Sequence, residues 1–375
     1  MRERKVTGAA GLLVAGAVTA VAVAVIAGSD ATTTRLVVAG TAPAGLPAGP
    51  LAASITARWS APAAMAGESA AAGAAVVVAG ADRVTGRDPR TGAERWSYRR
   101  GNARLCAWTA RDGVVVGVFG RLHGCTDLTA LAADTGARRW YRNADLGTTV
   151  TLTSANGVVV ARSDDQLLAV DTVTGLNRWT ARKPGCRYGP VAVGALGAAA
   201  VVRCADGRTL VVGHDAYGDT EHFSVAAPGT DAQVLSVDDS IAVLSRVGGV
   251  PTLTLYDQRG RVRGTVADGR LAAPGGATGT ASGATILVWT GADVVAVDAG
   301  TRSVAWSADA LGPPSLDGDR VLLAEPGGFV ERTLFGGEPA RRAVLRGGEP
   351  ARAAILSRIG TLVVATSPDA VTVYG

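Results

Sequence analysis

Four cysteines are the first residues of this chain whose type and spacing suggest chemistry: Cys106, Cys125, Cys186 and Cys204. An even number of cysteines in an exported chain suggests disulfides. No two of them form a CxxC pair. The chain has only three histidines, too few to favour a zinc site built from Cys and His.

A polar hairpin with the sequence HDAYGDTEH is the second candidate. It carries His214, Asp215, Asp219, Glu221 and His222. Cross-strand neighbours of these types could bind a divalent metal. Such a segment also fits a solvent-exposed hairpin tip at an outer sheet edge, which is the interpretation we favour, and we predict no metal and no cofactor.

Motifs of catalysis and of nucleic-acid binding are missing from the sequence. There is no GxSxG elbow, no P-loop and no dinucleotide fingerprint leading from a strand into a helix. The net charge is +5, but only Lys5 and Lys183 are lysines. This arginine and alanine bias is typical of a GC-rich genome, and no nucleic-acid-binding module is present. We predict a protein that is not an enzyme and does not bind nucleic acid.

The amino terminus has the pattern of a membrane anchor. Arg2, Arg4 and Lys5 precede an uncharged stretch from residue 6 to residue 29. Its apolar centre is long enough to cross about 30 Å of hydrocarbon as a helix, and the basic flank predicts a cytoplasmic amino terminus. We expect a basic tail (1–8), a transmembrane helix (9–28) and an Ala/Pro/Gly-rich tether (29–52). A cleaved signal peptide is the alternative.

An internal repeat organises the rest of the chain. Residues 88–96 (DPRTGAERW), 132–140 (AADTGARRW), 171–179 (DTVTGLNRW) and 298–306 (DAGTRSVAW) each follow a short apolar strand and end in tryptophan. The Thr-Gly pair predicts a tight turn. Weaker copies place Gly218 at the turn and His222 at the tryptophan position, and others centre on Gly260 and on Gly336 and Gly337. The period of about 40 residues is typical of a four-stranded propeller blade.

The two ends of the chain complement each other. The last sixteen residues, GTLVVATSPDAVTVYG, supply two strands that lack a following tryptophan strand, and ITARWSAP (55–62) is a tryptophan strand with nothing before it. Pairing the ends would close a ring and remove exposed sheet edges. We therefore predict an all-β fold over residues 53–375, an eight-bladed propeller, or a seven-bladed one if residues 312–350 are irregular. A solenoid would not explain why the ends match.

This signature resembles the PQQ-like propeller repeat of bacterial quinoprotein dehydrogenases and of the propeller lipoprotein of the outer-membrane assembly machine. The order of the repeats and the cysteines is similar to that of single-pass propeller proteins of actinobacteria. The resemblance implies that five tryptophans pack between blades: Trp59, Trp96, Trp140, Trp179 and Trp306. Quinoprotein dehydrogenases hold their quinone with a vicinal disulfide and acidic calcium ligands, and this chain has neither pattern.

The repeat register also selects a cysteine pairing. In a meander, the start of strand one, the end of strand two and the start of strand three share one face. This predicts the bridges Cys106–Cys125 and Cys186–Cys204, although the cysteine count alone allows three pairings. The alternative is four buried thiols. Two bridges would agree with an oxidising, extracytoplasmic location.

The same face should carry an arginine-rich sector, the candidate partner-binding surface, from the first four blades. Its members are Arg99, Arg100, Arg104, Arg121, Arg142, Arg182, Lys183 and Arg187. Anionic groups are natural partners for such a sector, and a solvated basic rim is the alternative. We predict a monomeric, single-pass membrane scaffold that binds a protein partner in the cell envelope. Binding of an anionic envelope glycan or lipid is the second hypothesis, and a quinoprotein-like enzyme is disfavoured.

Overall fold

A computed structural model describes residues 30–375, except residues 66, 68, 122, 123, 217, 219, 220, 274 and 275. The predicted basic tail (1–8) and transmembrane helix (9–28) lie outside the described residues. Within residues 30–375, no described helix is long and apolar enough to cross a membrane.

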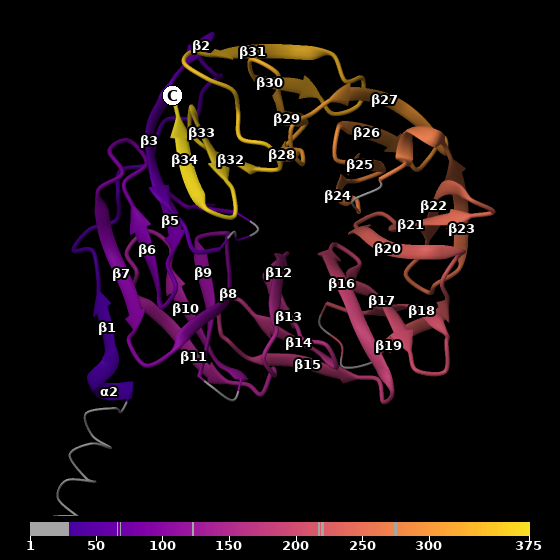
Figure 1. Cartoon of the computed structure of the whole chain (residues 1–375), viewed down its shortest axis with the longest axis horizontal. Coiled ribbons are helices and arrows are strands. Elements are labelled where there is room, and N and C mark those ends of the chain that lie inside the picture. The colour runs from indigo at the N-terminus through magenta and orange to yellow at the C-terminus, as the bar shows by residue number, and fades with distance from the viewer. Residues whose placement is uncertain are drawn as a thin grey trace, which may run out of the picture.

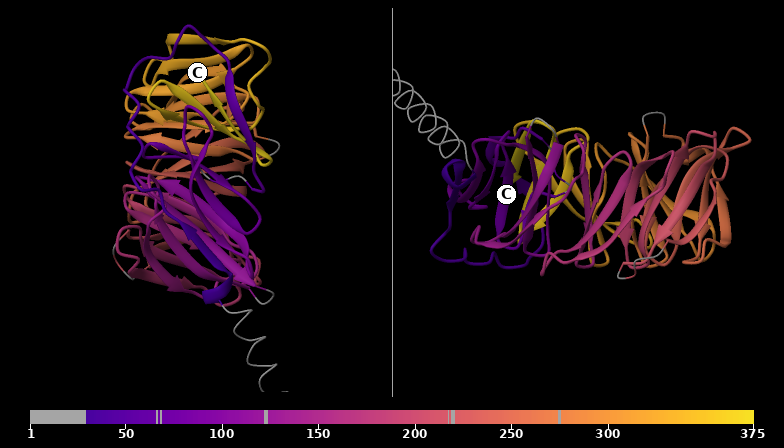
Figure 2. Two further views of the ribbon diagram at one scale, coloured as in Figure 1. Left: turned by 90° about the vertical axis from the view of Figure 1, so that its left-hand side faces the viewer. Right: turned by 90° about the horizontal axis from the view of Figure 1, so that it is seen from below.

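Eight antiparallel sheets form a ring of blades, which is seen along its axis in Figure 1 and from the side in Figure 2. The prediction of an eight-bladed propeller is confirmed. The seven-bladed alternative is wrong, because residues 312–350 contain a complete four-stranded blade, β28 to β31.

The strands of each blade follow one another from the ring axis outward. Blade 1 contains β4 (Ala71–Ala72), β5 (Ala75–Ala79), β6 (Arg83–Arg87) and β7 (Glu94–Arg100); blade 2 contains β8 (Arg104–Arg111), β9 (Val114–Arg121), β10 (Gly124–Ala132) and β11 (Arg138–Asn143). Blade 3 contains β12 (Thr151–Ala155), β13 (Val158–Arg162), β14 (Gln166–Asp171) and β15 (Asn177–Arg182); blade 4 contains β16 (Cys186–Gly194), β17 (Gly197–Cys204), β18 (Thr209–His214) and β19 (Glu221–Ala226). Blade 5 contains β20 (Thr230–Val237), β21 (Ile241–Val247), β22 (Val250–Tyr256) and β23 (Val262–Ala267), after which comes the short 3-10 helix η1 (Gly269–Leu271). Blade 6 contains β24 (Thr278–Ser282), β25 (Thr285–Trp289), β26 (Asp293–Asp298) and β27 (Ser303–Asp309); blade 7 contains β28 (Ser315–Asp317), β29 (Arg320–Glu325), β30 (Gly328–Thr333) and β31 (Pro339–Leu345). Blade 8 contains β32 (Ile355–Ile359), β33 (Leu362–Thr366), β34 (Ala370–Tyr374) and, from the start of the chain, β3 (Ala57–Pro62).

The middle strands of the blades are apolar on both faces because each blade packs against two neighbours. All five residues of β5 are buried, as are Val114 to Gly120 in β9. A strand buried on both faces reads as a continuous apolar run rather than an alternating one. This packing explains the runs of valine and alanine that punctuate the sequence.

The meander of each blade gives the ring two distinct faces. We call the connecting face the one that holds the links between blades and the hairpins between second and third strands. We call the turn face the one that holds the hairpins between first and second and between third and fourth strands. All the Thr-Gly turns of the repeat therefore lie on the turn face.

Strand β3 closes the ring, as the sequence predicts. It pairs antiparallel with β34, so that Trp59 lies opposite Val373 and Pro62 opposite Ala370. Figure 1 shows the C-terminus beside this early strand. The closure removes the two open edges that an unclosed ring would present.

The five predicted tryptophans occupy one repeated contact between blades. Each indole Nε1 donates a hydrogen bond to a carbonyl oxygen in the third-to-fourth-strand turn of the next blade, and the acceptors are Pro89, Ala133, Thr172, Asp215 and Leu334. The turn glycine sits against the indole, since a Cβ added at Gly136 would lie 2.7 Å from Trp96. Its positive φ of 73° is a second reason for glycine at this position.

In blade 4 the prediction of His222 at the tryptophan position is wrong, because Phe223 occupies it. Phe223 packs on Gly260 of the next blade, in the same way that Trp96 packs on Gly136. Its side chain is buried, whereas that of His222 is 39% exposed. A bulge between Gly213 and His214 sets this register.

The junction between blades 5 and 6 reverses the usual contact. Arg302 holds the place of the turn glycine with φ of 58°, and Gly264 holds the place of the tryptophan, opposite Leu255. A Cβ added at Gly264 would lie 2.3 Å from the Arg302 side chain. At this junction the large side chain therefore belongs to the turn of blade 6, and it packs on a glycine in the outer strand of blade 5.

Blades 2 and 4 each contain one disulfide that crosslinks two of their own strands. The pairing is the predicted one, Cys106–Cys125 in blade 2 and Cys186–Cys204 in blade 4. The second joins residues directly opposite each other in β16 and β17. The first spans β9, and bulges at both cysteines make this possible. Gly120 lies beneath it, and a Cβ there would come 2.9 Å from the Cys106 sulfur.

The segment predicted as a tether (29–52) lies along the propeller in its described part. After the short helix α2 (Asp30–Thr33), strand β1 (Thr34–Val37) adds a fifth strand to blade 1 by pairing with β7. The chain then passes blade 8, where Gly49 accepts a hydrogen bond from Arg358, and buries Leu51. Strand β2 (Ser54–Ile55) finally pairs with β31 of blade 7. Backbone pairing with blades 1 and 7 thus holds this segment against the propeller, although its composition is typical of a linker.

Candidate interaction surfaces

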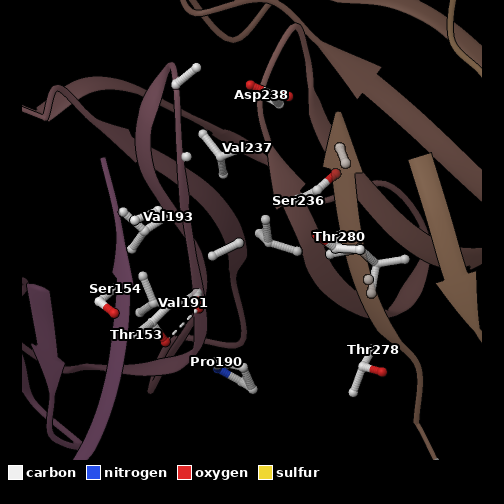
Figure 3. Close-up of a pocket in the computed structure, with 18 of the residues that line it drawn as sticks. Thr153, Ser154, Pro190, Val191, Val193, Ser236, Val237, Asp238, Thr278 and Thr280 are labelled. Carbon is white, nitrogen blue, oxygen red and sulfur yellow. Dashed lines mark hydrogen bonds between the residues drawn. The ribbon is translucent and has the colours of Figure 1, made fainter. Parts of the chain in front are cut away.

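The ring axis holds a channel whose lining residues are mostly small and uncharged. Cavities of about 440 and 690 Å³ lie along it, bordered by the innermost strands. Figure 3 shows Thr153, Val191, Ser236 and Thr280 in the first of these, with Thr153 donating to the Val191 carbonyl at 3.3 Å. Hydroxyl groups of this kind can bind polar molecules by hydrogen bonding. In the part of the chain that the structure describes, no three His, Cys, Asp or Glu side chains gather to hold a metal.

The polar hairpin of blade 4 separates its two histidines. His214 is buried and stacks on Trp179 with ring centroids 4.7 Å apart, whereas His222 lies 3.4 Å from the Asp215 carboxylate at the surface. Burial lowers the pKa of His214 to about 4, against the opposing effect of Glu221. Asp219 lies outside the described residues. His214 is thus packed against Trp179 as an aromatic ring, and the two histidines do not face a common metal site.

At least four of the eight predicted partner-binding residues form ion pairs with described residues of the propeller. The pairs are Arg99 with Asp82 (2.7 Å), Arg100 with Asp127 (3.0 Å), Lys183 with Glu221 (2.9 Å) and Arg187 with Asp164 (3.6 Å). Arg100 is 2% exposed, so it is part of the core and not of a surface. Arg187 is 80% exposed, so its pair is weak.

The other predicted residues are spread from the connecting face onto the outer wall. Arg104 donates to the Thr148 carbonyl, and Arg121 is exposed at the end of β9. Arg142 donates to the Gly175 carbonyl of the next blade, and Arg182 donates to the Gln166 side chain. These contacts direct Arg142 towards the outer wall between blades 2 and 3 instead of towards the disulfides.

One turn of blade 3 exposes apolar side chains on a rigid frame. The Asp171 carboxylate accepts hydrogen bonds from the backbone N–H groups of Val173 (3.0 Å) and Thr174 (2.7 Å), and Arg178 pairs with it. Burial by itself would raise the pKa of Asp171, but these hydrogen bonds lower it to about 2. Val173 is 62% exposed and Leu176 is 56% exposed. The turn therefore holds two apolar side chains in water with little freedom left to lose on binding.

A groove of about 200 Å³ lies beside this turn, between the outer strands of blades 2 and 3. Arg142, Asp145, Gln166, Gly175 and Arg182 are among the residues that line it. Two of the predicted partner-binding residues, Arg142 and Arg182, thus meet here. An apolar tip next to a groove with charges of both signs has the composition of a protein-binding surface.

The sequence of this turn differs from that of the other repeats at its two apolar positions. In the repeat alignment, Val173 stands where Arg90 and Gly300 stand in other blades, and Leu176 stands where Ala93 and Ser303 stand. A turn that faces water has no internal use for large apolar side chains. Val173 and Leu176 therefore depart from the repeat at positions that face water, and this departure indicates a candidate binding surface.

Comparison with known proteins gives one family match and many matches of fold. Residues 108–219, from within β8 to just beyond β18, match the family described as the outer membrane protein assembly factor BamB. A search of the curated proteins by sequence found no match. BamB from Moraxella catarrhalis is 18% identical, with a TM-score of 0.54, over 85% of this chain and 99% of that chain. The likeness is to the fold.

The computationally designed Ika8 protein is a second structural neighbour. It is 15% identical, with a TM-score of 0.58, over 85% of this chain and 98% of that one. A natural assembly factor and a designed protein share this architecture with the chain, so the architecture alone does not specify a function. The particular surfaces of this propeller have to carry the functional argument.

Proposed function

We propose that this protein is a membrane-anchored, extracytoplasmic β-propeller that acts as a non-catalytic protein-interaction scaffold in the cell envelope. The apolar turn with Val173 and Leu176, beside the groove lined by Arg142 and Arg182, is the observation that carries the proposal. The turn also lies inside the region that matches the BamB family, whose description is that of an assembly factor.

The amino terminus and the disulfides support the proposed location. Three basic residues precede an uncharged stretch long enough to span a bilayer, which supports an anchor with its amino terminus in the cytoplasm. Two disulfides in blades 2 and 4 support an oxidising compartment for the propeller. Glycan binding by the eight-residue basic sector has less support, because at least four of its charges are paired internally.

Affinity purification of the full-length protein from its own membranes, followed by mass spectrometry, tests the scaffold. The informative variant is Val173→Ser with Leu176→Ser, which keeps the Asp171 frame. Loss of two apolar anchors of more than about 1 kcal/mol each should weaken a specific partner at least 10-fold. Val262→Ser is the matched control, since Val262 is 59% exposed on the outer strand of blade 5.

A protein partner lost in the double variant and kept in the control would support the proposal. A partner recovered equally from both variants would remove this turn as its binding surface. If no protein is enriched after crosslinking in intact membranes, the scaffold function is rejected.

A further inference from the structure

Three arginines stand in one cross-strand row where the chain joins blade 1. Arg35 of β1 is the direct partner of Arg99 in β7, and Arg99 is the direct partner of Arg83 in β6. Directly opposed residues point to the same side of a sheet, with Cβ atoms about 5 Å apart. We call these three residues the arginine row.

The row carries more positive charge than its surroundings neutralise. Arg99 pairs with Asp82 at 2.7 Å. The side chains of Arg35 and Arg83 are exposed and form neither a hydrogen bond nor an ion pair with any other described residue. Like charges directly opposite each other in a sheet are destabilising. An anion bound across the row would relieve this repulsion, and the bidentate geometry of arginine suits phosphate.

The row lies where the chain arrives from the proposed membrane anchor. Thr34 pairs with Arg100, and the carbonyl of Thr33 accepts a hydrogen bond from Gly101 at 3.0 Å. Gly101 begins the link from blade 1 to blade 2, which belongs to the connecting face. The stretch that we propose as the spanning helix ends at residue 28, and the described chain begins at Asp30. Little chain is left to hold the connecting face of blade 1 away from the bilayer surface.

We propose that the arginine row binds the phosphate groups of anionic phospholipids and so holds the connecting face of the propeller against the membrane. The turn face, with Val173 and Leu176, then points away from the bilayer towards a protein partner. This inference rests on the proposed membrane anchoring and adds a ligand and an orientation to it.

A second feature of the connecting face agrees with this orientation. The hairpin between β21 and β22, across the ring in blade 5, exposes Val247 (45%) and Val250 (48%) on either side of a Gly-Gly turn. Apolar side chains at a tip of this kind suit the boundary between headgroups and acyl chains. The face thus offers a cationic contact at one side and an apolar contact at the other.

Energy transfer to a headgroup-labelled lipid tests the proposal on the full-length protein in nanodiscs. No cysteine of the described chain is free, so a single added cysteine takes the donor dye specifically. Pro368→Cys places it on the connecting face of blade 8, and Gln258→Cys on the turn face of blade 5. The faces are separated by the height of a blade, about 20 Å for a six-residue strand.

We expect strong transfer from position 368 and weak transfer from position 258 when the nanodisc contains phosphatidylglycerol. Replacing Arg35→Gln and Arg83→Gln together should lower the ratio of docked to undocked protein about 30-fold, since each arginine near an anionic surface contributes a factor of about five. Added salt should have the same effect. The control is Arg90→Gln with Arg138→Gln, which removes two exposed arginines from the turn face.

Equal transfer in discs of phosphatidylcholine alone, or unchanged transfer in the Arg35/Arg83 variant, would overturn the proposal. Failure of the anchor is detected separately, because a protein without a spanning helix is extracted from its own membranes by alkaline carbonate. Extracted protein that still binds phosphatidylglycerol vesicles through Arg35 and Arg83 would support the row and reject only the anchor.

Discussion

At the scale of single residues, His214 shows how a side chain suited to metal binding becomes part of the core. Its ring is 5% exposed, stacks on Trp179, and its Nε2 has no hydrogen-bond partner among the described residues. Burial lowers its pKa to about 4; Glu221 opposes this, whereas Lys183 and His222 add to it. The histidine is therefore neutral at pH 7 and costs free energy to protonate in the folded state.

This pKa predicts a loss of stability in mild acid. The unfolded histidine has a pKa of about 6.5, so between pH 6.5 and about 4 the unfolded state binds more protons than the folded one. The free energy of unfolding should fall across that range, by up to about 3 kcal/mol, and His214 should add no further loss below about pH 4. His214→Leu should flatten this part of the profile, measured by urea unfolding at several pH values.

Two comparisons make the assignment specific. The pKa of Asp171 is lowered to about 2, so its contribution is present above pH 3.8 and is lost only in stronger acid. His222→Gln should keep the loss seen in the unaltered protein. A profile of His214→Leu with the same slope between pH 6.5 and 4 would show that this histidine is not responsible.

At the scale of elements, the junction between blades is a contact in which one large side chain packs on one glycine of the neighbouring blade. We call this contact the lock. In most junctions the aromatic residue is on the strand and the glycine on the turn, as in Trp96 with Gly136. Between blades 5 and 6 the turn carries Arg302 and the strand carries Gly264. The two positions should therefore be energetically coupled across the interface.

A double-mutant cycle on Gly264 and Arg302 measures this coupling. Gly264→Trp alone should destabilise the protein by about 1–3 kcal/mol, because the new side chain overlaps that of Arg302. Adding Arg302→Gly should recover most of the loss, since it restores the usual lock and relieves an unfavourable φ. Thermal unfolding gives the coupling energy. Strictly additive effects would contradict the lock.

The blades themselves could be predicted from the sequence, whereas the strand register within them could be predicted only in part. The spacing from Asp88 to Trp96 is the same as that from Asp171 to Trp179, and it is also the spacing from Asp215 to Phe223. In blade 4, counting four residues on from Gly218 predicts His222, which is wrong, whereas counting eight residues on from Asp215 gives Phe223. The aspartate is the better marker because its carboxylate caps the turn, as Asp171 does.

At the scale of the whole molecule, the candidate surfaces depend on contacts that composition does not reveal. The five tryptophan contacts follow from the repeat because they recur at a fixed spacing, and both disulfides follow from the strand register that the repeat sets. The arginine row does not follow from the repeat, since Arg35 belongs to a segment rich in Ala, Pro and Gly and pairs with Arg99, 64 positions further along the chain. Likewise the burial of Arg100 depends on Asp127 in the next blade.

Ring closure is the remaining property of the whole molecule, and it involves Trp59, the most exposed of the five tryptophans between blades. The indole donates to the Pro89 carbonyl at 3.0 Å and packs on Gly92, joining blade 8 to blade 1. Trp59→Ala should cost about 2–3 kcal/mol, less than a fully buried tryptophan. It should also loosen strand β3, which completes blade 8 by pairing with β34, so that opened rings expose edges and associate.

Thermal unfolding with light scattering separates these two effects. Trp306→Ala is the matched comparison, because it removes the same contact between blades 6 and 7 while β3 still closes the ring on β34. We expect both variants to melt at a lower temperature and Trp59→Ala to scatter more below its transition. Equal scattering from the two would mean that β3 stays paired without its tryptophan, and that the backbone ladder from Ala57 to Pro62 is sufficient to keep the ring closed.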